Sequence, residues 1–365
     1  MKDRIASLVN AINRVGIENV ALLSRLTGIP TETVRYMIKK RFPELGLFVG
    51  LHVDYDKLGL ERNFAILEFA PDIIEHAPEL LKTLSKGAFL TYRCREVLRP
   101  RDIANFGVPA SQKRLFRSFL DQMLREKILL NFKIEPLEWV RNLALRSEYY
   151  DFKQNRWSID WKRVSSLKEP PPAPPMTIEP PIKPDIDLTD LLVIKELELQ
   201  SWRSFSDIAN RIGINDRTVR WHHTKHVKPL IRSFHVHRLS VGSEGLAKLV
   251  GLIHGFNHLS REEFKAVRLL FNNFPFTWNE AGRNDGYYRV VSTIPSEYFV
   301  EALQFLNANL QKQLTKWEVY TLDMSTSHWY TIPYENYGRN GWYFDSDRAM
   351  NAMLLVRNDQ KIRGI

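Results

Sequence analysis

The chain has 365 residues, of which 44% are hydrophobic and 26% charged, so it is not a disordered protein. Its length allows about two to four domains. Lysine and arginine outnumber aspartate and glutamate by 52 to 42, and the formal net charge is +10. This excess favours a polyanionic partner, because each phosphate that a cation neutralises releases condensed counterions.

The single cysteine, Cys94, excludes an internal disulfide and a multi-cysteine metal site. No apolar run approaches the roughly 20 residues that span a bilayer. The first residues also lack the apolar centre of a signal peptide. We therefore expect a cytoplasmic protein without a membrane partner, and nothing in the sequence indicates a resident cofactor.

The first part of the chain predicts helices followed by alternating strands and helices. Apolar residues recur at helical spacing at 5–12, a short helix covers 20–26, and a third begins at Thr31. The stretch FVGLHVDY (48–55) alternates like a strand, and with KLGL (57–60) it predicts a short hairpin. A strand–helix–strand–strand–helix–strand order follows, which predicts a four-stranded antiparallel sheet with two helices on one face. Its elements are expected at 63–69, 73–84, 89–98, 103–108, 115–127 and 128–134.

A proline-rich segment divides the chain. Residues 170–187 read PPPAPPMTIEPPIKPDID, with eight prolines in 18 positions. Proline fixes φ and removes a backbone donor, so we expect an extended, semi-rigid linker without helix or sheet. At about 3.1 Å per residue, such a linker would reach roughly 55 Å.

The two sides of this linker align at a constant offset of 185 residues. Gly28 matches Gly213, TVRY at 33–36 matches TVRW at 218–221, and six positions match between 149–160 and 334–345. The chain is therefore interpreted as a tandem duplication, and we expect an internal pseudo-dimer with two sheets packed against each other. Homo-oligomers are a further expectation.

The predicted α+β organisation is winged helix-turn-helix 1 at 1–52, ferredoxin-like domain 1 with an aromatic tail at 53–167, the linker at 168–187, winged helix-turn-helix 2 at 188–240, and ferredoxin-like domain 2 with an aromatic tail at 241–365.

Each copy carries the pattern of a helix-turn-helix, which is a short helix, a turn with glycine and a second helix with a polar outer face. Gly28 and Gly213 stand at the turns, where a positive φ would disfavour a Cβ atom. The outer faces carry side chains that suit phosphates and base edges, and their differences predict an asymmetric site on double-stranded DNA. The predicted contacts are Thr31, Glu32, Thr33, Arg35, Tyr36, Lys39, Lys40 and Arg41 in the first copy, and Asn215, Asp216, Arg217, Thr218, Arg220, Trp221 and Lys225 in the second.

Each copy resembles the Lrp/AsnC (feast/famine) family. The stretch VDYDKLGL at 53–60 is similar to the family's link after the wing, and LTDLLVIKEL with FSDIANRIGINDRTV is similar to its opening helices. The resemblance implies a bacterial- or archaeal-type transcriptional regulator that binds double-stranded DNA and is not an enzyme. The family's effector turn commonly carries a glycine and an aspartate, but this sequence keeps at most Gly87 there, so any small-molecule effector stays unidentified.

Five histidines gather in the second copy, at 222, 223, 226, 235 and 237. His222 and His226 are four residues apart and share a helix face, as zinc ligands on one helix do. No cysteine lies near them, and no acidic residue stands at ligand spacing. The sequence therefore predicts no metal site and favours contacts of these histidines with phosphate or water.

The two tails, YYDFKQNRWSID and YENYGRNGWYFD, combine aromatic residues with asparagine, arginine and aspartate. Trp157 and Trp342 can either stack on a planar ligand or form a satellite core that covers a sheet edge.

Two other functions remain open. Some relatives of this fold are tetrapyrrole decarboxylases, whose substrates carry several carboxylates and suit basic pockets. His254, His328 and Arg289 are candidates for that role, and no other catalytic residue is predicted. The chain also fits a winged-helix scaffold that docks proteins and binds no DNA.

Overall fold

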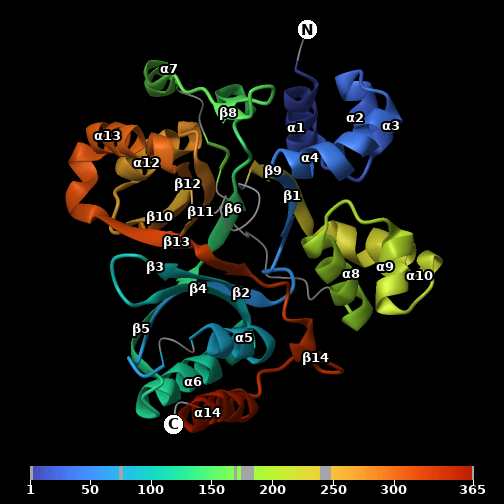
Figure 1. Cartoon of the computed structure of the whole chain (residues 1–365). Helices are drawn as coiled ribbons and strands as arrows, with labels where there is room; N and C mark the ends of the chain where they lie inside the picture. The colour runs from blue at the N-terminus through green and yellow to red at the C-terminus, as the bar shows by residue number, and fades with distance from the viewer. Residues whose placement is uncertain (1–2, 74–76, 168–170, 174–184, 239–247, 364–365) are drawn as a thin grey trace.

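The computed structural model describes residues 3–73, 77–167, 171–173, 185–238 and 248–363, and it has the α+β class that the sequence predicts (Figure 1). We call the residues before 168 the first half and those after 184 the second half. Most of the predicted linker lies outside the described residues. Within the described ranges, no helix is both long and apolar enough to cross a membrane.

Each half opens with a bundle of short helices. The first bundle comprises α1 (Arg4–Val15), α2 (Val20–Thr27), α3 (Thr31–Tyr36), the π-turn η1 (Met37–Arg41) and α4 (Phe42–Glu44). The second bundle comprises α8 (Leu188–Leu199), α9 (Phe205–Ile212), α10 (Asp216–His222), the π-turn η5 (His223–Val227) and the 3-10 turn η6 (Lys228–Leu230). Gly28 and Gly213 end α2 and α9 with φ of 71° and 75°, the left-handed conformation that a glycine tolerates best.

The strands that follow the two bundles pair with each other. β1 (Leu47–Val53) and β9 (Ile231–Arg238) form a two-stranded antiparallel ribbon in which Gly50 lies opposite His235. The short hairpin predicted at 48–60 is therefore wrong. The partner of β1 comes from the second half, whereas residues from Leu60 onward enter a different sheet.

Nine further strands of the described residues form one antiparallel sheet, in the order β5-β2-β4-β3-β13-β10-β12-β11-β6. The first half contributes β2 (Leu60–Phe69), β3 (Leu90–Glu96), β4 (Asp102–Pro109), β5 (Leu129–Leu137) and β6 (Trp139–Asn142). The second half contributes β10 (Leu249–Phe256), β11 (Thr277–Gly282), β12 (Tyr288–Pro295) and β13 (Trp317–Trp329).

This sheet closes on itself. The first part of β13 pairs with β10 and its last part pairs with β3 of the other half. At the far end of the order, β5 runs into β6 through the single residue Glu138, and β6 pairs with β11 of the other half. The two half-sheets consequently face each other, and Phe64 and Tyr320 from opposite halves belong to one apolar cluster, with ring centroids 6.2 Å apart.

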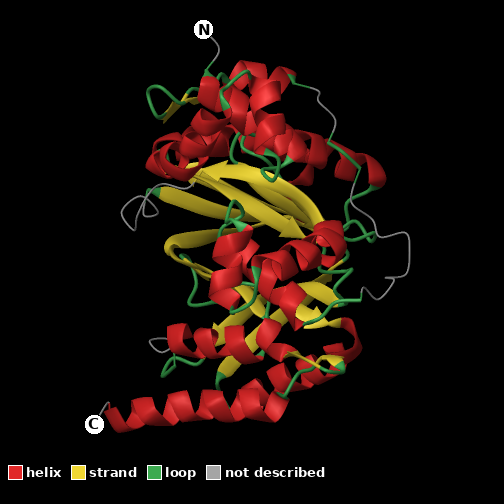
Figure 2. Ribbon diagram, turned by 90° about the vertical axis from the view of Figure 1, so that its right-hand side faces the viewer, coloured by secondary structure: helices red, strands yellow, loops and turns green. Residues whose placement is uncertain are grey.

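Helices cover the outer faces, so that the strands lie between helical layers (Figure 2). The first half-sheet is covered by α5 (Ala77–Gly87), α6 (Lys113–Arg125) and the C-terminal helix α14 (Ser346–Arg363). The second half-sheet is covered by α12 (Arg261–Asn273) and α13 (Phe299–Leu310). The buried stripe of α6 shows the helical spacing that the sequence predicts, with Phe116, Phe119, Leu120 and Met123 facing inward.

Each aromatic tail packs on the opposite half. The first tail contains β7 (Tyr150–Asp151), β8 (Arg156–Trp157) and α7 (Trp161–Ser166), and the Trp161 ring lies 5.0 Å from that of Phe305 in α13. The second tail contains β14 (Tyr337–Gly338) and β15 (Gly341–Trp342). The ring of Phe344, which follows β15 in the same tail, lies 5.3 Å from the ring of Phe119 in α6. Each half therefore completes its apolar core with side chains from the other.

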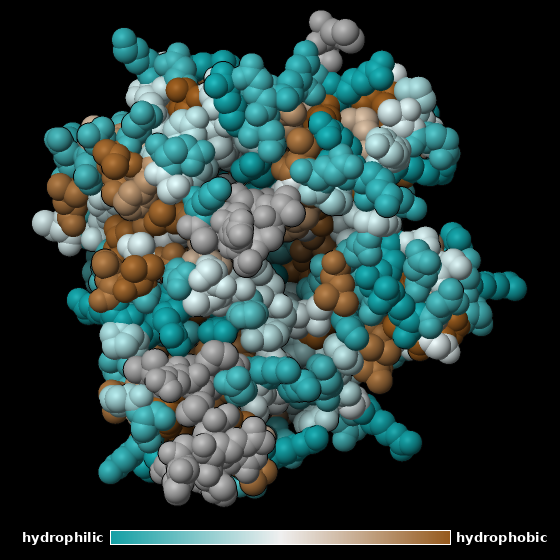
Figure 3. All heavy atoms as spheres, viewed as in Figure 1, coloured by the Kyte–Doolittle hydropathy of each residue, from teal (hydrophilic) through white to brown (hydrophobic). Residues whose placement is uncertain are grey.

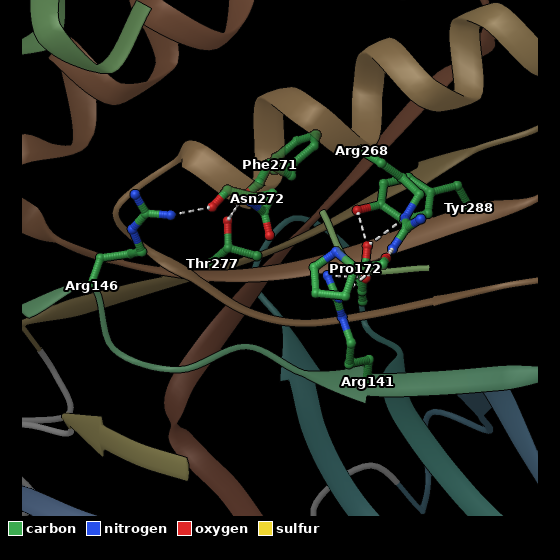
Figure 4. Close-up of polar contacts among 9 residues, drawn as sticks. Arg141, Arg146, Pro172, Arg268, Phe271, Asn272, Thr277 and Tyr288 are labelled. Atoms are coloured by element: carbon green, nitrogen blue, oxygen red, sulfur yellow. Dashed lines mark hydrogen bonds and ion pairs between the residues drawn. The ribbon is translucent and has the colours of Figure 1, made fainter. Parts of the chain in front are cut away.

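A buried carboxylate secures the junction between β6, α12 and the segment that leaves the first half (Figure 4). Glu280 is 1% exposed and accepts hydrogen bonds from Arg268 at 2.8 and 3.1 Å and from the Tyr288 hydroxyl at 2.9 Å. Arg141 of β6 lies 2.6 Å from the same carboxylate. Both arginines also donate to the backbone carbonyl of Pro172, at 2.9 Å for Arg268 and 3.3 Å for Arg141.

Replacing Glu280 with glutamine should lower the free energy of unfolding by about 3–5 kcal/mol, because two buried guanidinium groups would lose their counter-charge. Urea denaturation measures this change. Glu262→Gln is the matched control, since Glu262 is exposed in its ion pair with Lys265 and should change stability by less than about 1 kcal/mol. Equal effects of the two substitutions would contradict the role assigned to Glu280.

Candidate functional site

A cavity of about 410 Å³ lies between the β1–β9 ribbon and the facing half-sheets. Its lining comes from both halves and includes Gly50 of the ribbon, Asn105 of β4 and Ile253 of β10. Figure 3 shows the surface hollowed, with apolar atoms exposed, beside the position of the ribbon in Figure 1. The closure of the sheet and the pairing of the ribbon thus create one chamber shared by the two halves.

Two histidines that match at the sequence offset of 185 line this cavity. His52 of β1 and His237 of β9 are 185 residues apart, and each is 5% exposed. Burial lowers the pKa of His237 to about 3, with a further contribution from the charge of His235. Burial, followed by the charge of Arg62, holds the pKa of His52 well below its usual range. Both imidazoles are therefore neutral near pH 7 and can donate and accept hydrogen bonds or ligate a metal through nitrogen.

Aromatic rings form one wall of the cavity. The Trp278 ring of β11 stacks on His237 with centroids 4.8 Å apart and an interplanar angle of 16°. Trp329, at the end of β13, stacks on Trp278 at 6.1 Å, and Tyr92 of β3 lies 5.4 Å from Trp329. A wall of this kind offers apolar, polarisable surface to a flat ligand.

Two arginines give the cavity positive charge. Arg289 of β12 is 3% exposed, and it donates to the Asn105 side-chain oxygen at 3.2 Å and lies 4.4 Å from the Phe64 ring. Arg62 of β2 donates to the Val53 carbonyl at 2.9 Å and lies 4.1 Å from the Tyr55 ring. Among the described residues, neither guanidinium has a carboxylate oxygen within 4.0 Å. Such groups attract the carboxylates of a ligand.

A weak acid completes the lining. Glu198 reaches the cavity from α8 of the second bundle, and it accepts a hydrogen bond from the Ile332 backbone N–H at 2.7 Å. The Tyr55 hydroxyl lies 3.5 Å from its other oxygen. Burial raises the pKa of Glu198 to about 7, against the opposing effects of the Ile332 hydrogen bond and the Arg62 charge. This carboxyl group is therefore suited to give up a proton near neutral pH.

The predicted DNA contacts lie outside the cavity, on the surfaces of the two bundles. Tyr36 and Trp221 are 59% and 51% exposed, so the outer faces of α3 and α10 are open to solvent. Several charges on these faces already have partners within the chain, since Arg35 pairs with Glu32, Arg41 with Glu44, and Arg220 with Asp216. Asn215 caps α10 by accepting from the Thr218 backbone N–H at 2.7 Å.

The tail tryptophans also lie outside the cavity. Trp157 is 8% exposed and packs on Phe276 with centroids 4.9 Å apart. Trp342 donates its indole N–H to the Leu58 carbonyl at 2.7 Å and packs beside Phe89. Both rings are thus part of the packing between halves.

Of the three residues suggested for a tetrapyrrole enzyme, Arg289 lines the cavity. His254 is fully buried on the opposite face of β10, where its ring stacks on Trp317 and accepts from the indole N–H at 3.3 Å. His328 is exposed near the end of β13.

Sequence reasoning missed His52, Arg62, Trp278 and Glu198, which lie far apart along the chain. His52 could have been found from the sequence, because it aligns with His237 at the offset of 185 residues. The other three have no equivalent in the opposite copy, where Ala247, Arg93 and Asn13 stand at the matching positions.

Two solved structures of the siroheme decarboxylase NirDL match this chain over its whole length. The complex with an iron-uroporphyrin III analogue superposes with a TM-score of 0.53 at 10% identity, and the match covers 97% of this chain and 99% of that one. The second structure gives a TM-score of 0.51 at 10% identity, with 98% and 100% covered. At this identity the likeness establishes the fold alone.

Regulators of the Lrp/AsnC group resemble parts of the chain. The AsnC structure from E. coli covers 38% of this chain and 90% of its own at 17% identity, but its TM-score of 0.28 is too low to support a conclusion. No family model matches the sequence, and no curated protein matches it.

The full-length comparison corrects the functional prediction. The expectation that the chain is not an enzyme is wrong, because the structures that match both halves and their arrangement are those of an enzyme. Both full-length matches are structures of one tetrapyrrole enzyme, whereas the AsnC regulator matches only part of this chain.

The burial of His237 predicts a specific pH dependence of stability. The folded state holds this histidine neutral, with a pKa of about 3 against 6.5 for an ordinary histidine. As the pH falls below about 6.5, the unfolded chain takes up the proton first, so the contribution of neutral His237 to stability is lost at up to about 1.4 kcal/mol per pH unit.

His237→Gln should remove this part of the acid sensitivity, so the difference in unfolding free energy between wild type and variant should shrink as the pH falls from 6.5 toward 3. Urea denaturation across this window measures the difference. His258→Asn, at an exposed histidine with φ of 56°, is the control and should keep the wild-type slope. Parallel profiles for wild type and His237→Gln would contradict the assignment.

Proposed function

We propose that the protein is a decarboxylase of a tetrapyrrole that carries several carboxylate groups. In this proposal it consists of two Lrp/AsnC-like units, each a helix-turn-helix bundle followed by a ferredoxin-like domain, fused into one chain, and the strand after each bundle pairs with its counterpart in the other unit. The observation that carries the proposal is the shared cavity, where stacked aromatic rings, two neutral histidines and two arginines that have no carboxylate partner among the described residues line the same space.

The lining suits the shape and charge of such a substrate. A volume of about 410 Å³ lies within the range of small-molecule sites, and the cavity is partly open, so a large macrocycle can extend beyond it. The Trp278 and Trp329 rings can contact a planar face. Arg62 and Arg289 can each hold one carboxylate through paired N–H donors.

The reaction needs an acid and a means of stabilising the electrons that the departing carboxylate leaves behind. The C–C bond to the carboxylate breaks, carbon dioxide leaves, and the electron pair stays on the ring-attached carbon, where a proton then forms the new C–H bond. Glu198, with a pKa of about 7, is suited to deliver that proton. The conjugated macrocycle can delocalise the electron pair, and no oxidant is consumed.

The neutral imidazoles of His52 and His237 can act at the same site. Either can hydrogen-bond to the reacting carboxylate, and either can ligate the iron of a metallated substrate, since a neutral histidine nitrogen is a usual axial ligand of tetrapyrrole iron. The surrounding burial supports both roles because it keeps the rings unprotonated.

The test is binding and turnover of an iron-tetrapyrrole that bears acetate and propionate groups. We expect a shift of the visible absorption band on binding, and products that have lost carbon dioxide in mass spectra. Arg289→Gln should weaken binding by roughly 10- to 100-fold, because one charge-assisted contact is worth about 1.5–3 kcal/mol. Glu198→Gln should instead lower the turnover rate while substrate still binds.

The matched control for lost positive charge is Arg261→Gln, at an exposed arginine in the first turn of α12. This variant should bind and react as wild type does. No spectral shift with any carboxylated tetrapyrrole, or equal binding by the Arg289 and Arg261 variants, would refute the proposal.

Double-stranded DNA binding is a second candidate function, supported by one observation. The exposed faces of α3 and α10 lie on the same side of the molecule, the right-hand side in Figure 1. Two helices arranged in this way can address neighbouring parts of one duplex. The exposed candidate contacts include Arg217 on α10, and Lys40 and Lys225 in the π-turns that follow the two helices.

Fluorescence anisotropy with a labelled random-sequence duplex tests this second function. Binding should weaken steeply as salt is raised, and Lys40→Ala should reduce the slope of log affinity against log salt by about 1. Affinity that does not respond to salt, or that is unchanged in Lys40→Ala and Arg217→Ala, would exclude these helices as DNA contacts.

A further inference from the structure

Two histidines and an aspartate converge in the second bundle, away from the cavity. Asp190 lies in the first turn of α8 and is fully buried. The Nδ1 atom of His222 lies 2.8 Å from one oxygen of Asp190, and the Nδ1 atom of His226 lies 3.0 Å from the other. No acidic partner for these histidines was evident from the sequence, because Asp190 precedes His222 by 32 residues and comes close only through the packing of α8 against α10.

The first bundle has the same backbone but not these side chains. At the offset of 185, Asp190, His222 and His226 correspond to Ile5, Met37 and Arg41. Met37 is buried, Ile5 packs against the same apolar core, and both bundles have a π-turn after the exposed helix. The fold of the bundle therefore does not require a polar cluster at this place, and the second copy has one where the first is largely apolar.

The charge of Asp190 needs compensation. A buried carboxylate is costly unless it is paired with a cation. Within the described residues, no lysine or arginine forms an ion pair with Asp190, and its polar contacts are the two imidazoles and the backbone N–H of Asp187. A bound cation would pair with this buried carboxylate and would use the nitrogen atoms that already point at it.

We propose that Asp190, His222 and His226 bind a divalent transition-metal ion of the zinc type. One ligand atom from each residue lies within 4.8 Å of the others, a spacing that a single ion can bridge with small side-chain rotations. Two imidazole nitrogens and one carboxylate oxygen form a donor set that suits Zn²⁺ and Co²⁺ rather than Ca²⁺ or Mg²⁺. Asp187, with an oxygen 3.7 Å from the His222 Nδ1 atom, or a water molecule can complete the coordination.

An ion can reach the site from solvent, and the site connects two helices of the second bundle. His226 is 22% exposed, which gives an ion a path to the buried Asp190. The ion joins the start of α8 to the end of α10 and the π-turn η5, so it fixes the exposed helix of the second bundle to the helix whose far end carries Glu198.

The experiment uses the full chain, freed of any affinity tag and treated with a chelator. Titration with Zn²⁺ in a calorimeter should show one ion bound per chain, and Co²⁺ should give the visible absorption bands of a low-coordinate site. Asp190→Asn keeps the shape of the side chain, and His226→Gln changes a partly exposed one. Each should weaken Zn²⁺ binding by at least roughly 10- to 100-fold.

His258→Asn is the control, because it removes an exposed histidine elsewhere and should leave Zn²⁺ binding unchanged. Circular dichroism of each variant verifies that it is folded. Absence of Zn²⁺ binding by the folded wild type, or undiminished binding by folded Asp190→Asn and His226→Gln, would overturn the proposal.

Discussion

The structure depends on strands that the two halves share. β13 is hydrogen-bonded first to its own half and then to β3, and β5 with β6 makes the reciprocal connection to β11. Because these two connections close the sheet, neither half has a free edge there. The exchanged tails and the Glu280 cluster reinforce the same junction, since each places side chains of one half in the core of the other. The two halves therefore form one cooperative unit.

The cavity follows from this closure. Facing half-sheets bring Asn105 and Arg289 into contact, and the ribbon above them contributes His52 and His237. A site assembled from so many strands is held by the sheet rather than by loops, which favours fixed positions for its polar groups. Glu198 differs from the strand residues, because it enters from a helix of the second bundle, so its position depends on how that bundle packs against the sheet.

The α+β class of the fold was predictable from local patterns, and the tandem duplication stays a prediction. Helical spacing in 5–12, the glycine turns at Gly28 and Gly213, and the 185-residue offset each arise from residues close in sequence or from direct comparison. Pairing between halves was not predictable, because nothing in β1 distinguishes a partner in its own half from β9. The cavity and the Asp190 cluster were missed for the same reason, and only His52 was within reach through its match to His237. The functional prediction was based on the exposed helices, because local sequence patterns reveal them. It did not use the residues that line the cavity.

The differences between the two halves have a consequence for selectivity. The paired positions of His52 and His237 retain the twofold relation of the ribbon, but Arg289 has Ala104 as its counterpart, and Trp278 has Arg93. A homodimer with exact twofold symmetry would offer a bound ligand two equivalent orientations, which are related by the twofold axis. A single chain with different side chains on the two sides of the cavity favours one orientation, so a given substituent of an unsymmetrical ligand contacts the same side chains each time it binds.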